Sequence, residues 1–121
     1  MVRNFILYIL GIVCFVSSCN YQNEEELFPS TSCDTEAMSL ASDITPILTN
    51  YGCLSCHSTV SNQGSVALEN YDDLKKWVDN GILLKSMQHD GALAMPQNQA
   101  KMNACDIEKV AAWITDGALN N

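Results

Sequence analysis

Cys53-Leu54-Ser55-Cys56-His57 places two cysteines three residues apart, with a histidine directly after the second one. This spacing is the attachment signature for haem c. On a helical turn, residues i, i+3 and i+4 share one face, so Cys53, Cys56 and His57 can all point at one flat ligand. The two thiols then form thioether bonds to the haem, and the His57 imidazole is the proximal iron ligand. We therefore predict one covalently bound haem c.

A Cys-x-x-Cys pair also occurs in zinc sites and in thiol oxidoreductases. A zinc site of this kind needs a second pair of ligands at similar spacing, and the sequence shows none. A thiol oxidoreductase places the pair at the start of a helix in a strand–helix–strand unit, and the flanking residues lack that pattern. Haem attachment is the preferred interpretation, and a non-haem binding lipoprotein with a Cys53–Cys56 disulfide is a further alternative.

The N-terminal residues have the pattern of an export signal. Arg3 precedes an apolar run from Phe5 to Val16, which is too short for a comfortable membrane span. Small residues then precede Cys19, as at the cleavage site of bacterial lipoproteins, where the cysteine becomes the lipidated first residue. We predict a lipoprotein signal peptide over residues 1–18 and lipidation of Cys19. An ordinary signal peptide that is cut nearby is the alternative.

Residues 19–31 are polar and acidic, and they include three consecutive glutamates. This composition predicts a flexible tether between the lipid and the folded domain, although an acidic run here also resembles the surface-export signals of Bacteroidetes lipoproteins. We expect a protein anchored only by its lipid in the periplasm or on the outer membrane, with exposure at the cell surface as a further option.

The charge of the chain limits its partners. The 121 residues carry a formal net charge of −8 and are enough for one small domain. Such a surface repels nucleic acid and steers the protein toward a partner with a basic docking patch.

Residues 32–121 form the predicted folded domain, and alternating strand patterns are scarce in them. Apolar residues recur at helical spacing in several segments. We predict a first helix that begins at Ser42 or Asp43 and a second from Asn70 or Tyr71 to Asn80. A short helix follows from Ile82 to Met87. The last helix runs from about Ala104 to Gly117 and is capped by Asn103. Buried residues of the first helix are Ile44, Ile47, Leu48 and Tyr51. Trp77 is expected in the core, with a haem propionate contact as the alternative.

Met95 is the predicted second axial ligand. It precedes Pro96 in a loop, and a proline restricts the residue before it to an extended conformation, which fixes the direction of the side chain. A thioether ligand favours ferrous iron and raises the reduction potential. The alternative ligand is His89, which would give bis-histidine ligation with His57 and a lower potential. His89 could also be a surface residue or a propionate contact.

Cys33 and Cys105 are left over once the haem motif, Cys19 and the signal-peptide residue Cys14 are assigned. An exported domain lies in an oxidising compartment, where two remaining cysteines usually pair. We predict a Cys33–Cys105 disulfide that joins the segment before the first helix to the start of the last one. Two separate reduced thiols are the alternative.

Taken together, the haem motif and Met95-Pro96 resemble a class I cytochrome c. The wider frame is similar to small cytochrome c-like lipoproteins of Bacteroidetes over roughly residues 33–121. It comprises Cys33, Asp43-Ile44-Thr45-Pro46-Ile47-Leu48, Tyr71-Asp72-Asp73-Leu74, Cys105-Asp106-Ile107 and Trp113-Ile114-Thr115-Asp116-Gly117-Ala118. The resemblance implies an all-α fold of three to five helices around one haem c, with crossing N- and C-terminal helices and with His57 and Met95 as axial ligands.

The function that this resemblance implies is electron transfer between redox partner proteins. Such a carrier is not an enzyme and needs no catalytic acid, base or nucleophile. The alternative is a haem c enzyme or a sensor of gases or other small ligands, in which the sixth iron position is open. Met95 separates the two hypotheses, because it fills that position in the carrier.

Overall fold

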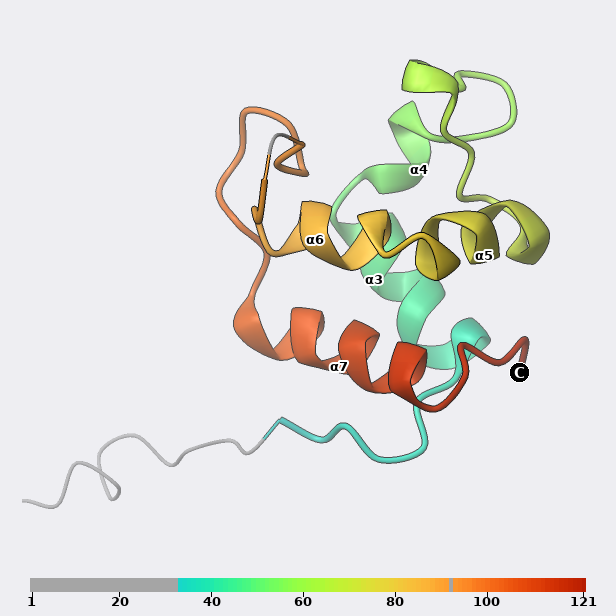
Figure 1. The fold of residues 1–121 in the computed structure, drawn as a ribbon, viewed down its shortest axis with the longest axis vertical. Coiled ribbons are helices and arrows are strands. Elements are labelled where there is room, and N and C mark those ends of the chain that lie inside the picture. Colours follow the sequence, from blue (N-terminus) through green and yellow to red (C-terminus); the bar gives the residue numbers. More distant parts are fainter. Residues whose placement is uncertain (1–32, 92) are drawn as a thin grey trace, which may run out of the picture. The chain divides into compact units, whose positions relative to one another are not determined.

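The structure is a computed structural model, and it describes residues 33–91 and 93–121 (Figure 1). The predictions for the signal peptide, for Cys19 and for the acidic tether lie outside these residues. The described residues form one compact unit, Cys33–Asn121, whose regular elements are all helical. The predicted all-α class is therefore confirmed for this part of the chain. None of its helices combines the length and the apolar character needed to cross a membrane.

The elements follow one another with short connections, except for the long segment of residues 88–103 between α6 and α7. In chain order they are the π-helical turn η1 (Leu40–Ile44), α3 (Thr45–Asn50), α4 (Cys53–Cys56), the 3-10 turn η2 (Gln63–Ser65), α5 (Tyr71–Asp79), α6 (Ile82–Met87) and α7 (Ala104–Thr115).

The first helical segment begins earlier than predicted. The cap is Ser39, not Ser42 or Asp43: its hydroxyl accepts the Ser42 N–H at 3.0 Å, while its own N–H donates to the Asp43 carboxylate at 2.9 Å. This reciprocal pair satisfies two backbone N–H groups, those of Ser39 and Ser42. The helical segment therefore begins at Leu40. Of the predicted inner face, Ile44, Ile47 and Leu48 are buried, whereas Tyr51 is half-buried and packs against the core.

The later helices lie close to their predicted bounds. The Asn70 side chain accepts the Asp73 N–H at 3.0 Å and starts α5, and the Asn103 side chain accepts the Cys105 N–H at 2.8 Å and starts α7. Gly81 separates α5 from α6 with a φ of 72°, a conformation that glycine adopts without strain. Helix α7 ends at Thr115, and the Ala118 N–H closes it by donating to the Trp113 carbonyl at 2.8 Å.

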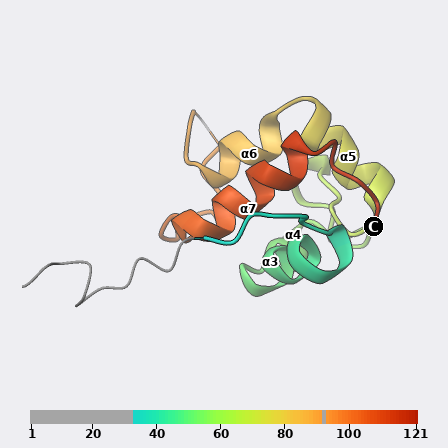
Figure 2. The same cartoon turned by 90° about the horizontal axis from the view of Figure 1, so that it is seen from below.

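The core gathers buried side chains from every long helical element. The largest fully buried ones are Trp113, Ile44, Leu48, Leu74 and Val110. Helix α7 contacts both η1 and α6, and in Figure 2 it lies between α6 and the η1–α3 segment. Trp113 is the largest fully buried side chain, and its indole N–H donates to the Leu119 carbonyl at 3.0 Å.

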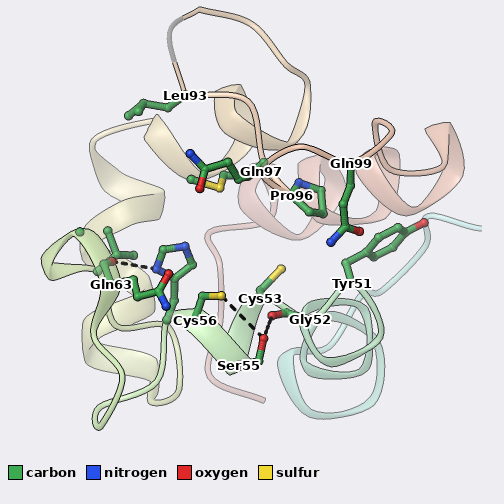
Figure 3. Close-up of a pocket in the computed structure, with 14 residues that line it drawn as sticks. Tyr51, Gly52, Cys53, Ser55, Cys56, Gln63, Leu93, Pro96, Gln97 and Gln99 are labelled. Carbon is green, nitrogen blue, oxygen red and sulfur yellow. Dashed lines mark hydrogen bonds between the residues drawn. The ribbon is translucent and has the colours of Figure 1, made fainter.

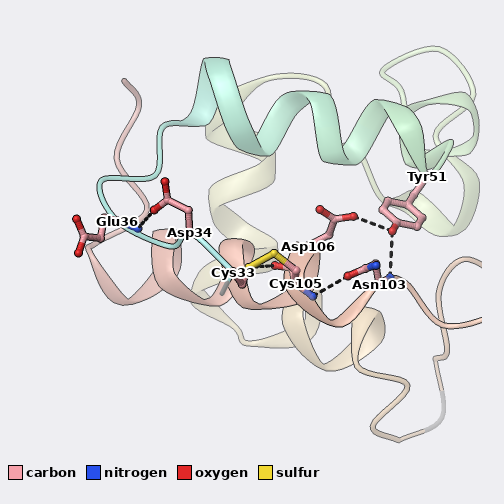
Figure 4. Close-up of a disulfide and its surroundings, with 7 residues drawn as sticks. All are labelled: Cys33, Asp34, Glu36, Tyr51, Asn103, Cys105 and Asp106. Atoms are coloured by element: carbon pink, nitrogen blue, oxygen red, sulfur yellow. Dashed lines mark hydrogen bonds between the residues drawn. A yellow bond between two sulfur atoms is a disulfide. The ribbon is translucent and has the colours of Figure 1, made fainter. Parts of the chain in front are cut away.

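One disulfide and three hydrogen bonds join distant segments of the folded unit. The predicted Cys33–Cys105 disulfide is present, with the two Cα atoms 5.3 Å apart (Figure 4). The Tyr51 hydroxyl donates to Asp106 at 2.8 Å and accepts the Asn103 N–H at 3.0 Å. The Ala41 N–H donates to the carbonyl of Asn121, in the C-terminal tail, at 3.0 Å. These contacts hold the N-terminal segment, the end of α3 and the start of α7 together.

Candidate functional site

The Cys-x-x-Cys-His stretch forms a single helical turn, as predicted. Gly52 has a φ of 69° at the start of α4, and this left-handed conformation turns the chain sharply after α3. The His57 N–H then donates to the Cys53 carbonyl at 2.9 Å, which closes the turn. Cys53, Cys56 and His57 consequently project from neighbouring positions of one turn.

These three side chains line a cavity of about 500 Å³, and Met95 lines it as well. The full lining is Tyr51, Gly52, Cys53, Ser55, Cys56, His57, Gln63, Gly64, Val66, Leu93, Met95, Pro96, Gln97 and Gln99. Figure 3 shows Cys53 and Cys56 on one side of this space and Pro96 and Gln97 across from them. The volume lies within the range of small-molecule and cofactor sites, roughly 300–1,000 Å³. The fold therefore brings all four predicted haem-binding residues to one cavity.

The His57 ring is held in one tautomer. Its Nδ1 lies 3.1 Å from the Gln63 carbonyl oxygen, which can only accept, so Nδ1 carries the proton. The Nε2 lone pair is then free, which is the form in which histidine binds a metal, and such a second partner fixes the orientation of the ring. The His57 carbonyl also accepts the Leu68 N–H at 2.8 Å, so both ring and backbone are fastened to the segment that follows.

Met95 differs from the other described methionines. Met38, Met87 and Met102 are 8%, 3% and 4% exposed and belong to the core, whereas Met95 is half-buried and lines the cavity. Its backbone N–H donates to the Ser86 carbonyl at 3.0 Å, and the Met95–Pro96 peptide bond is cis. Among the described methionines, Met95 is the one that lines the cavity.

The structure does not bring His89 or Trp77 to the cavity wall. The His89 Nε2 instead lies 3.1 Å from the Met95 carbonyl oxygen, and this contact again places a ring proton on the nitrogen. Trp77 is half-buried and packs against the hydrophobic core. The bis-histidine alternative and the Trp77–propionate alternative thus have no support in this geometry.

Cys53 and Cys56 are the two free cysteines of the described residues. Burial raises the pKa of the Cys53 thiol, with a further contribution from Cys56. A redox-active cysteine instead needs a lowered pKa, because the thiolate is the nucleophile. The raised pKa of Cys53 therefore does not favour thiol–disulfide exchange at this residue.

The lining also contains residues that the sequence analysis did not assign to the site. Tyr51, Gln97 and Gln99 contribute neutral polar groups, while Val66 and Leu93 contribute apolar surface. No Asp, Glu, Lys or Arg is among the lining residues, although the chain as a whole carries a net charge of −8. For most of these residues, the sequence offers one indication that they line the cavity, which is that they lie near Cys53 or Met95 along the chain.

Comparison with known proteins adds no relative: no family model, no curated protein and no solved structure matches this chain. Whether a haem fits the cavity therefore depends on the sulfur and nitrogen atoms of the residues that line it. Two thiols, one imidazole with a free Nε2 and one thioether line a single cavity. This set contains the atoms needed to attach a haem through sulfur and to bind its iron from both sides.

Proposed function

We propose that residues 33–121 are a monohaem c-type cytochrome domain of the class I kind, and that the protein is an electron carrier. The observation that supports this best is the shared cavity of Cys53, Cys56, His57 and Met95. The chain reaches Met95 only after α5 and α6, so this meeting is a property of the fold and not of the local motif. The all-α arrangement around α7 supports the same proposal.

Each residue has a defined role in this proposal. Cys53 and Cys56 hold the haem through thioether bonds, and His57 binds iron through Nε2 while the Gln63 carbonyl fixes its ring. Met95 would be the second iron ligand, through its sulfur. When bound, the haem supplies a one-electron couple. With His57 and Met95 both holding the iron, this chain would leave no iron position for a small ligand, as an electron carrier requires.

The surface charge complements this role. The lining of the cavity contains no Asp, Glu, Lys or Arg, so the acidic residues lie elsewhere on the protein and act over a longer range. They steer the carrier toward a partner with a basic patch, and salt screens this attraction. Transfer rates to such a partner should fall as ionic strength rises; rates that increase with salt would contradict the steering.

We propose further that the protein is exported and anchored through lipidated Cys19, in the periplasm or on the outer membrane. The apolar run and the small residues before Cys19 support this. Metabolic labelling with a fatty acid tests it: the wild-type protein is labelled, and Cys19→Ser is not. An unlabelled wild-type protein would show that an ordinary signal peptide operates.

The decisive experiment is a covalent haem stain on a denaturing gel, using full-length protein from a host that matures c-type cytochromes. A stained band whose mass exceeds that of the processed, lipidated chain by one haem supports the proposal, and a colourless protein rejects it. A ferric spectrum then separates carrier from sensor. Sulfur–iron absorption indicates a carrier, whereas fast binding of cyanide or carbon monoxide by the wild type indicates an enzyme or sensor with an open sixth site.

A further inference from the structure

Both backbone polar groups of Met95 are bonded to the end of α6. The Met95 N–H donates to the Ser86 carbonyl at 3.0 Å, and the Met95 carbonyl accepts a hydrogen bond from His89 Nε2 at 3.1 Å. The Ser86 carbonyl also accepts the His89 N–H at 3.2 Å, so one oxygen joins the two residues. These three residues form what we call the Met95 clamp.

The clamp is tied to the rigid part of the fold. Helix α6 places Leu83 and Met87 in the core, at 6% and 3% exposure, so Ser86 lies on an anchored helix. His89 has a φ of 56°, a left-handed conformation in which histidine is several-fold enriched among non-glycine residues. This conformation follows directly on α6 and lets the His89 ring meet the carbonyl of a residue six positions further along the chain.

We propose that His89 is a positioning residue for Met95. Its Nε2–H holds the Met95 carbonyl, and the position of the Met95 backbone determines where the sulfur lies in the cavity. A movement of the Met95 backbone that takes the sulfur away from the iron would break the hydrogen bond from His89. The inference rests on the proposed function and assigns His89 a role in it other than iron ligation.

The test compares His89→Leu with His89→Gln in the full-length protein. Both variants place a non-glycine residue in the left-handed conformation of position 89, so the conformational free-energy cost of that backbone is similar in the two. Glutamine retains an N–H donor at about the reach of Nε2, and leucine removes it. Added imidazole competes with Met95 for ferric iron, so its apparent affinity measures how firmly the sulfur is held.

We expect His89→Leu to raise the imidazole affinity roughly threefold to tenfold, as loss of one neutral hydrogen bond predicts, and to weaken the sulfur–iron absorption. His89→Gln should stay within about twofold of wild type. Equal behaviour of the two variants, with the sulfur–iron band intact in both, would overturn the positioning role and leave the proposed function standing.

A second measurement does not depend on haem. Nitrogen NMR of the neutral His89 ring distinguishes the two tautomers in the purified wild-type protein, whether or not it is coloured. The clamp requires the proton on Nε2, and a proton on Nδ1 overturns it. A wild-type protein that has the Nε2–H tautomer but no sulfur–iron band would instead show that the ligand assignment of the proposed function is wrong.

Discussion

The Nδ1 atom of His57 lies 3.1 Å from the carbonyl oxygen of Gln63, and the two residues face the same cavity. Because the acceptor is a backbone atom, its position depends on the conformation of η2 and not on the side chain at position 63. Residues 62–65 adopt an unusual series of positive φ angles, with Asn62 at 39°, Gly64 at 66° and Ser65 at 60°. This short turn therefore determines which nitrogen of His57 is free to bind a metal.

Gly64→Ala should destabilise the fold through this turn. An added Cβ meets nothing closer than 4.0 Å, so the cost is conformational rather than steric. An alanine at φ 66° costs about 1–2 kcal/mol, and we expect the free energy of unfolding to fall by about 1 kcal/mol in urea titrations. Gly64→Asn is the matched control, because asparagine tolerates this conformation. An equal decrease in the free energy of unfolding in both variants would show that the added side chain, and not the backbone conformation, destabilises the fold.

Met95→Ala and Met102→Ala should separate ligation from packing. Met102 is 4% exposed, so its truncation leaves a core cavity and lowers the free energy of unfolding by about 2–5 kcal/mol, with sulfur–iron absorption retained. Met95 is half-buried on the cavity wall, and its truncation should abolish that absorption and open the iron to cyanide. The spectra and cyanide binding of both purified variants test this. Unchanged Met95→Ala spectra would contradict ligation by Met95.

The Cys33–Cys105 disulfide closes a long loop, since the two residues are 72 positions apart. In the chain-entropy description, a loop of this length stabilises the folded state by about 4 kcal/mol. The double variant Cys33→Ala, Cys105→Ala should lose about that much free energy of unfolding while the covalent haem stain persists. The wild type treated with a thiol reductant is the control, and it should unfold at the same denaturant concentration as the variant.

The positions of the helices could be predicted because their signals are local. Asn70 and Asn103 cap the helices that follow them, and Gly81 separates α5 from α6. The start at Leu40 was missed because Ser39 and Asp43 act as a pair across four residues, whereas Ser42 and Asp43 each looked like a cap alone. Local patterns of this kind predict which element forms better than they predict its first residue.

The cavity residues that could be predicted lie in two short motifs, Cys53-Leu54-Ser55-Cys56-His57 and Met95-Pro96. Cys53, Cys56 and His57 follow from their spacing, but the roles of Gln63 and His89 depend on contacts between segments. The sequence marks His89 as an alternative iron ligand, while the fold turns its ring to the Met95 carbonyl instead. Gln97 and Gln99 reach the cavity because the chain after α6 folds back, and no periodic pattern encodes that return.

Tyr51 should make the stability of the protein depend on alkaline pH. The Asn103 N–H lowers the pKa of Tyr51, but the hydrogen bond to Asp106, burial and the negative charge of Asp106 together raise it above its usual value. The folded state thus binds this proton more tightly than the unfolded state does. Its contribution to stability is complete below the unfolded pKa of about 10 and is lost as the pH rises through the folded pKa.

Urea unfolding of the wild type and of Tyr51→Phe at a series of pH values measures this contribution, because other titrating groups cancel in the difference. The wild type should be the more stable near pH 9, and its advantage should shrink as the pH rises above about 10. Asp106→Asn is the control: it keeps an acceptor but removes the charge, so the pKa of Tyr51 falls and the loss begins at lower pH. An advantage that stays constant across this range would show that the Tyr51 hydroxyl does not titrate differently in the folded state.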